Sequence, residues 1–262
     1  MTSNDLELAD SELVGWGRPE AQLRSALAKD EFTLFCQPIR ALNGGEPYPI
    51  AEVLIRMREE EKALLPPGDF IPVFEHYKLM PELDRWVVRH TLASLAEGSR
   101  IRRFSINLST QTLRDPEFPG FVAGQLAAHR VSAESILFEI DESDTLHRLD
   151  AVVQFADAYR ELGGMLMIDA FGRRSASFAA LQAIGAKFVK VDGVITRKLL
   201  TNPIAQRKMN ALIHVSRALG FALVAEFVEE QDVLLRLKAL GVDYAQGFGI
   251  AVPQPIGVFR SA

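Results

Sequence analysis

Short apolar segments that each end in one polar residue recur along the chain and alternate with segments of helical periodicity. Residues 163–174, GGMLMIDAFGRR, show the pattern: a glycine pair precedes four apolar residues, and Asp169 follows them. A short apolar run between glycines is typical of an inner strand in a parallel sheet. Five further predicted strands end in the same way, with Asn107, Glu139, Lys190, Glu226 and Gln246.

The full pattern predicts eight strands, at residues 32–39, 48–57, 103–107, 136–140, 165–169, 187–191, 222–226 and 244–246. Helices are predicted at 18–29, 69–78, 82–97, 118–129, 145–162, 177–184, within 193–219, and at 231–240. This alternation implies parallel strands joined by right-handed crossovers, and eight such units favour a (β/α)8 barrel of the TIM type over an open sheet. No GxGxxG turn follows an early strand, which argues against a dinucleotide-binding fold.

Composition and charge narrow the class of protein. A chain of 262 residues with 48% hydrophobic content suits one barrel domain, which we expect at residues 18–262 behind a flexible acidic leader at 1–17. The formal net charge of -5 predicts no general attraction to a nucleic acid polymer or to an anionic membrane. Cys36 is the only cysteine, and no apolar run reaches the length of a membrane span, so we expect a cytoplasmic protein without membrane insertion.

The strand-end residues suggest a chemistry, because such side chains converge on one face of a barrel. Glu52, Asn107, Glu139 and Asp169 offer only oxygen ligands, a set that suits Mg²⁺, Mn²⁺ or Ca²⁺. Lys190 and Arg56 would balance the charge of a phosphate, and Glu226 would orient or deprotonate a water molecule. These are the parts of a metal-assisted phosphodiester hydrolase.

Two alternatives stay open at this point. Each residue taken singly is most simply a polar strand end that meets water. Barrel glycosidases also carry carboxylates at strand ends, although Asn107 and Lys190 favour the phosphodiester hypothesis.

Eight short motifs follow one another in a familiar order: QPI from Gln37, EVLIR from Glu52, SINLS from Ser105, FEIDES from Phe138, IDAFG from Ile168, KVD from Lys190, AEFVE from Ala225 and QGF from Gln246. With these motifs the chain resembles the EAL domain, a bacterial family of cyclic di-GMP phosphodiesterases. The resemblance extends from about Phe32 to Pro255. It implies a TIM-like barrel whose first strand is antiparallel to the others.

The resemblance also implies roles for individual residues. Metal ligands would be Glu52, Asn107, Glu139 and Asp169, and Lys190 and Glu226 would position the attacking water. Residues that grip cyclic di-GMP would be Gln37, Leu54, Arg56, Asp84, Glu226, Phe227, Gln246 and Pro253.

Three departures from the family pattern change this expectation. Ala170 stands where the family carries a second aspartate of a two-metal site, so we expect at most a single weakened Mg²⁺ or Mn²⁺ site. Arg173 and Arg174 replace small residues in a loop that contacts Glu142 in active members. Phe227 replaces a glycine, as in degenerate, receptor-type EAL domains, and its ring would stack on a guanine. The alternative is tolerated drift at Ala170, solvated charges on the arginines, and plain packing of Phe227.

We therefore predict a signalling receptor that binds cyclic di-GMP, has lost or strongly reduced its phosphodiesterase activity, and acts through a protein partner or as a homodimer. In this hypothesis Lys190 and Glu226 are vestigial catalytic residues. An active metal-dependent phosphodiesterase that produces pGpG is the first alternative. A scaffold that has given up the nucleotide is the second.

Overall fold

A closed ring of strands forms the centre of the molecule in the computed structural model, which describes residues 18–58, 64–173 and 178–261. The barrel strands are β1 (Phe32–Ala41), β2 (Ile50–Arg58), β4 (Arg103–Asn107), β5 (Ile136–Asp141), β6 (Met165–Phe171), β7 (Phe188–Val191), β8 (Ala222–Ala225) and β9 (Tyr244–Ala245). Two short strands, β3 (Leu64–Leu65) and β10 (Gln254–Pro255), pair with β2 and β1 outside the ring. The predicted (β/α)8 TIM-like barrel is confirmed.

Strand β1 runs against its neighbours and closes the ring. It pairs antiparallel with β2 from Phe32↔Met57 to Ile39↔Ile50, and antiparallel with β9 at Arg40↔Ala245. The remaining neighbours in the ring pair in parallel, from β2–β4 to β8–β9. The antiparallel first strand expected from the resemblance is confirmed. Its cause is local, because residues 42–49 form a glycine-containing turn and too few residues remain for a crossover helix.

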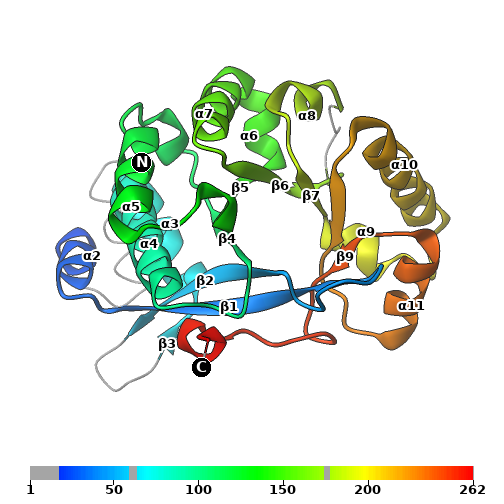
Figure 1. Cartoon of the computed structure of the whole chain (residues 1–262), viewed down its shortest axis with the longest axis horizontal. Helices are drawn as coiled ribbons and strands as arrows, with labels where there is room; N and C mark the ends of the chain where they lie inside the picture. The colour runs from blue at the N-terminus through cyan, green and yellow to red at the C-terminus, as the bar shows by residue number, and fades with distance from the viewer. Residues whose placement is uncertain (1–17, 59–63, 174–177, 262) are drawn as a thin grey trace.

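The helices form an outer layer around the strands (Figure 1). They are α2 (Pro19–Ala28), α3 (Pro67–His76), α4 (Met80–Ala96), α5 (Phe118–His129), α6 (Glu142–His147), α7 (Leu149–Glu161), α8 (Phe178–Ile184), α9 (Gly193–Arg197), α10 (Pro203–Leu219) and α11 (Gln231–Leu240). The C-terminal segment, with β10 and the 3₁₀ turn Ile256–Phe259, runs along β1 instead of a helix (Figure 1).

Two predicted elements differ from the structure. The helix predicted at 145–162 is two helices, because Asp141 caps α6 by accepting a hydrogen bond from Ser143 N at 2.7 Å, and the backbone breaks at Arg148. The strand predicted at 165–169 continues to Phe171 through an irregularity, as described below. The predicted leader at 1–17 lies outside the described residues.

The barrel interior consists of an apolar layer with a polar layer above it. The apolar layer contains Ile39, Ile50, Leu137, Met167, Phe188 and Val224. Side chains alternate along a strand, so the residue two positions further along points inward again. Those residues are Glu52, Glu139, Asp169, Lys190 and Glu226, and in the antiparallel β1 the matching position is Gln37, two residues before Ile39. Strand register alone thus gathers the predicted polar residues at one end of the barrel.

Among the described residues, no helix has both the length and the apolar character to cross a lipid bilayer.

Candidate active site at the carboxyl ends of the strands

The ammonium group of Lys190 lies at the centre of the polar layer. It is fully buried, and its Nζ lies 2.7 Å from Glu139 Oε2, 2.8 Å from Glu52 Oε2 and 3.9 Å from Glu226 Oε1. Burial disfavours a charged lysine, yet the surrounding carboxylates outweigh burial and hold the pKa of Lys190 well above its usual value. Lys190 therefore stays charged and links strands β2, β5 and β8 through β7.

Glu52 is the best-satisfied carboxylate of the layer. Its Oε2 accepts hydrogen bonds from Lys190 Nζ at 2.8 Å and Gln246 Nε2 at 2.7 Å, and its Oε1 accepts one from Asn107 Nδ2 at 2.9 Å. Burial opposes its ionisation, but the Lys190 charge and these three donors prevail and lower the pKa of Glu52. Glu52 is the carboxylate that the site keeps ionised.

Glu139 and Glu226 have raised pKa values, in contrast to Glu52. Burial raises the pKa of each carboxyl to about 8, and the charge of Lys190 offsets this only in part, since Glu52 and Asp169 add repulsion. Burial likewise raises the pKa of Asp169, with further contributions from Glu52 and Asp141. One lysine cannot neutralise four neighbouring carboxyl groups, so the layer holds protons that ordinary carboxylates would release.

Asp169 lies on a bulge near the end of β6. The pairing with β7 steps from Ile168↔Val189 to Phe171↔Val191, so Asp169 and Ala170 together face Lys190 alone. Ala170 has a positive φ of 53°, which is unusual for a residue with a side chain. Bulges re-aim side chains next to active sites. Here the bulge places Asp169 at the polar layer and the buried methyl group of Ala170 directly after it.

The chemistry of the predicted metal ligands fits a hard divalent cation. Asp169 Oδ1 and Glu139 Oε1 are buried oxygens without a hydrogen-bond donor among the described residues. Such unpaired oxygens are suitable ligands for Mg²⁺ or Mn²⁺. Among the described residues, however, no group of three or more His, Cys, Asp or Glu side chains is arranged to hold a metal ion. The Lys190 ammonium lies between Glu52 and Glu139 and offsets part of their charge.

Gln37 and Gln246 connect the layer to the C-terminal segment. Gln246 Nε2 donates to Gln37 Oε1 at 3.1 Å, and Gln37 Nε2 donates to the carbonyl oxygen of Ala251 at 3.0 Å. Pro253, two residues after Ala251, is half-buried and forms no hydrogen bond with the polar layer among the described residues. The structure therefore brings both glutamines to the polar layer, while Pro253 lies at its edge.

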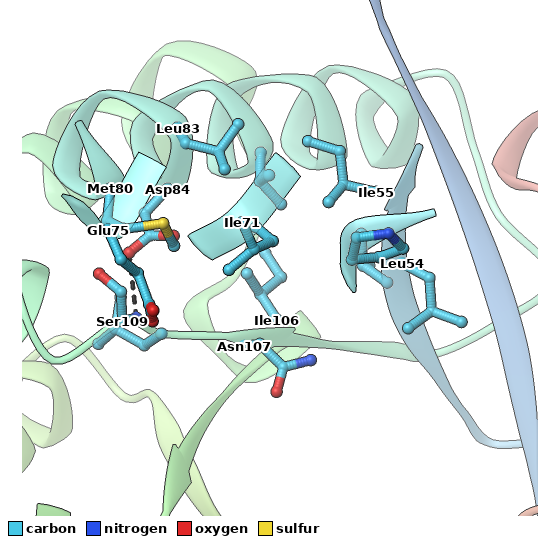
Figure 2. A pocket seen from close by; sticks show the side chains of 14 residues that line it. Leu54, Ile55, Ile71, Glu75, Met80, Leu83, Asp84, Ile106, Asn107 and Ser109 are labelled. Carbon is cyan, nitrogen blue, oxygen red and sulfur yellow. Dashed lines mark hydrogen bonds between the residues drawn. The ribbon is translucent and has the colours of Figure 1, made fainter. Parts of the chain in front are cut away.

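A cavity of about 310 Å³ opens beside the polar layer and contains two more of the predicted ligand residues. Figure 2 shows Leu54 at one end of this cavity and Asp84 near Ser109 at the other, with Asn107 between them on the far side of β4. Asp84 Oδ2 accepts a hydrogen bond from Ser109 N at 3.1 Å. Burial raises the pKa of Asp84 to about 6, although hydrogen bonds from Thr112 and Ser109 oppose the shift.

Arg56 stands apart from the polar layer. It follows Glu52 on the same face of β2, but its Nη1 donates to its neighbour's carbonyl, Ile55 O, at 2.8 Å. Its guanidinium carbon lies 5.7 Å from the centroid of the Phe35 ring. The structure thus places Arg56 further along the strand, at the mouth of the barrel, without a carboxylate partner among the described residues.

Phe227 also lies at the mouth, immediately after Glu226, with 49% of its surface exposed. Its φ is 54°, the same left-handed backbone as at Ala170. The ring packs on Gly193, where an added Cβ would meet Phe227 Cδ2 at 2.2 Å, and the Arg197 guanidinium lies 4.6 Å from the ring centroid. Helix α9 therefore supports the ring.

Asp192, which the sequence pattern did not single out, has a defined place in the structure. Asp192 is buried, caps α9 by accepting a hydrogen bond from Val194 N at 2.9 Å, and accepts one from Arg173 Nε at 2.6 Å. An aspartate directly before a glycine and a helical segment is a recognisable capping signal. Nothing in the pattern indicated its pairing with Arg173, while Arg174 lies outside the described residues.

The family model of the EAL domain matches residues 20–253. The chain belongs to the EAL domain family.

Individual relatives of this EAL domain include enzymes and solved complexes. The cyclic di-GMP phosphodiesterase PdeF of Escherichia coli K12 is 33% identical over 238 residues, which cover 90% of this chain and 32% of the relative. The FimX EAL domain of Pseudomonas aeruginosa bound to c-di-GMP superposes with a TM-score of 0.85 at 28% identity, covering 91% of this chain and 97% of that one. The PaMucR phosphodiesterase in its c-di-GMP complex gives 0.83 at 26% identity, covering 90% and 97%. The chain spans about a third of the length of the curated relatives that it matches.

Proposed function

We propose that this EAL domain binds cyclic di-GMP as a signalling receptor and has lost most or all phosphodiesterase activity. The observation that carries the proposal is Ala170, whose methyl group follows Asp169 at the end of β6 where a second carboxylate would be needed for a second metal ion. Without that carboxylate, the activation of a water molecule loses one of its two cations.

The ligand-binding part of the site supports the proposal. Leu54 and Asp84 line the cavity beside the polar layer, Gln37 and Gln246 are bonded to each other, and Arg56 lies at the mouth. In the proposed complex Arg56 holds a phosphate, the exposed Phe227 ring stacks on a guanine, and Glu226 accepts hydrogen bonds from a guanine edge. Pro253 closes the edge of the site. Solved relatives bind c-di-GMP, as the names of the FimX and PaMucR complexes state.

A metal ion, if bound, would be held by Glu52, Asn107, Glu139 and Asp169 at a single weakened Mg²⁺ or Mn²⁺ site. It would supply a Lewis acid for a phosphate oxygen. Lys190 would keep Glu52 and Glu139 in place through its two short contacts.

A paired binding and turnover assay tests the proposal. Calorimetry with cyclic di-GMP in EDTA measures binding, and chromatography of the same protein with Mg²⁺ or Mn²⁺ measures pGpG formation. We expect binding without metal and no appreciable pGpG. Turnover above about 1 per second, within the ordinary range of enzymes, would reject the receptor hypothesis.

A second candidate is a slow phosphodiesterase, which the assembly of Lys190, Glu226 and the other strand-end residues favours. The substitution Ala170→Asp separates the two. Its backbone is compatible, since aspartate is enriched at positive φ. A large gain in activity would mean that the rest of the catalytic apparatus is intact. The absence of any heat with cyclic di-GMP would instead favour the nucleotide-independent scaffold.

We further propose that the signal passes to a protein partner or across a homodimer, and that the protein works in the cytoplasm, in keeping with its single buried cysteine, Cys36.

A further inference from the structure

We propose that Arg173, fixed by Asp192, is a phosphate-binding residue that takes the electrostatic place of a second metal ion in this chain. The proposal rests on cyclic di-GMP being the ligand and adds a site that the motifs do not assign. It makes Arg173, two residues after the end of β6, part of the ligand-binding surface.

The anchor of this arginine is rigid. Asp192 is 1% exposed, and its two oxygens accept hydrogen bonds from Val194 N and Arg173 Nε. Its backbone N–H also donates to the carbonyl oxygen of Phe171 at 3.0 Å, which ties it to the end of β6. A buried carboxylate that is bonded on both oxygens has little freedom, so it fixes the position of the guanidinium.

The residue before Arg173 is held just as firmly. Gly172 N donates to Glu142 Oε1 at 3.1 Å, and Gly172 O accepts from Lys208 Nζ at 2.7 Å. Helices α6 and α10 thus hold the backbone from two sides. The backbone from which the Arg173 side chain extends is therefore fixed.

The guanidinium of Arg173 keeps donors available for a ligand. Its Nε donates to Asp192, whereas neither terminal nitrogen donates a hydrogen bond to any of the described residues. The side chain is 61% exposed. A planar guanidinium with two available terminal nitrogens matches the geometry of a phosphate oxygen pair.

The location of Arg173 suits a ligand that carries two phosphates. Hydrogen bonding and charge from Asp192 raise the pKa of Arg173, and Asp141 and Asp169 add to the shift, so its charge acts at the same end of the barrel as the polar layer. Arg56 lies on β2, and the ring order β2–β4–β5–β6 separates the two strands by two others. One arginine on each side of the mouth can serve one phosphate each. Ala170 provides no carboxylate that would hold a second metal ion. The guanidinium of Arg173 supplies positive charge close to that position instead.

Calorimetry with cyclic di-GMP in EDTA tests the proposal on the full chain. We expect Arg173→Gln to weaken binding about tenfold or more, as befits a charged hydrogen bond, and to reduce the salt dependence of the dissociation constant. Arg173→Lys keeps the charge without the planar fork and should recover part of the loss. The matched control Arg207→Gln removes an exposed arginine on α10 and should change affinity less than about twofold.

Thermal melts of the unliganded variants test whether Arg173 has only a structural role, since a structural role would lower the melting temperature. If Arg173→Gln binds as the wild type does, the proposal is overturned. If Arg173→Lys is as weak as Arg173→Gln while both melt like the wild type, the fork itself is essential, which supports it. If the wild type binds no cyclic di-GMP at all, the proposed function fails first, and the two failures are thereby distinguished.

Metal stoichiometry gives an independent readout. Titration with Mn²⁺, followed by the paramagnetic signal of free ion, should show at most one tight site in the wild type. The double variant Ala170→Asp with Arg173→Thr should gain a second site, because it removes the fixed cation and adds a ligand. Two tight sites in the wild type, with Arg173 in place, would overturn the substitution of metal by guanidinium.

Discussion

The polar layer inside the barrel and the rim just above it, formed by Ala170, Arg173 and Phe227, differ in how their residues are held in place. In the layer, Glu52, Glu139 and Lys190 lie on regular strands, and the buried Lys190 ammonium contacts both carboxylates within 2.8 Å. On the rim, Ala170 and Phe227 each follow a strand-end acid and adopt the same left-handed backbone, with φ near 53° and 54°. The layer contains the residues that the resemblance assigns to metal binding, whereas the departures Ala170, Arg173 and Phe227 lie on the rim.

This difference shows where such a domain can change function at small structural cost. A layer residue has partners on several strands, so replacing it leaves buried charges unpaired. On the rim, the half-exposed Phe227 ring packs on Gly193 and Arg197 of α9, so its loss leaves no buried charge unpaired. Variants of the two regions should therefore differ in kind: layer variants lose stability, and rim variants change affinity.

The largest expected effect comes from the centre of the layer. Lys190→Met leaves Glu52 and Glu139 buried without their cation, and we expect a loss of about 3–5 kcal/mol in the free energy of unfolding at neutral pH. Urea denaturation measures it. The control Lys198→Met removes an exposed lysine at the end of α9 and should change stability by no more than about 0.5 kcal/mol. A loss below about 1 kcal/mol for Lys190→Met would remove the distinction between layer and rim.

The next largest effect is the pH dependence of the layer. The pKa of Glu139 and of Glu226 is raised from 4.5 to about 8, so between these values the folded protein keeps protons that the unfolded chain has released. Stability therefore falls as pH rises through this range, and we expect a lower urea midpoint at pH 8 than at roughly pH 5.5. Urea midpoints at the two pH values measure it. Glu139→Gln should flatten the dependence, and a midpoint that rises with pH would contradict the assignment.

Much of the polar layer could be predicted from the sequence, because its residues follow the two-residue alternation of side chains along each strand. Glu139 and Lys190 lie two positions after apolar residues that point into the barrel, and parallel register brings such residues to one end without further information. The barrel itself was predictable for the same reason. The antiparallel β1 was not, because eight alternating units imply parallel pairing; only the resemblance to the family indicated it.

The rim could not be predicted in the same way. The bulge at Asp169 and Ala170, the contact of Phe227 with Gly193, and the pair of Arg173 with Asp192 join loops whose backbone does not follow a period. The helix predicted at 145–162 failed for a related reason, since its break depends on the cap at Asp141. Local turns and caps, rather than strand register, set these positions.

A rim variant should change affinity without changing the fold. Phe227→Ala keeps a Cβ at the same positive φ, so the backbone strain stays and only the ring is lost. Stacking of a base on an aromatic ring contributes about 1–3 kcal/mol, so we expect about tenfold weaker binding of cyclic di-GMP by calorimetry, with the urea midpoint nearly unchanged. Leu235→Ala, at an equally exposed position on α11, is the control. Equal affinity for Phe227→Ala and the wild type would show that the ring only packs.

The smallest effect tests whether the Phe227 ring rests on α9. A Cβ at Gly193 would meet the Phe227 ring at 2.2 Å, so Gly193→Ala should displace the ring and cost about 1 kcal/mol of stability. In the Phe227→Ala background the obstacle is gone, and the same change should be neutral. The double-mutant cycle in urea therefore gives a coupling energy of about 1 kcal/mol. Gly124→Ala, on α5 with open space around its Cα, is the control and should be neutral or stabilising. If Gly193→Ala is neutral in both backgrounds, the ring does not rest on α9, and the rim would be free to close over a ligand by itself.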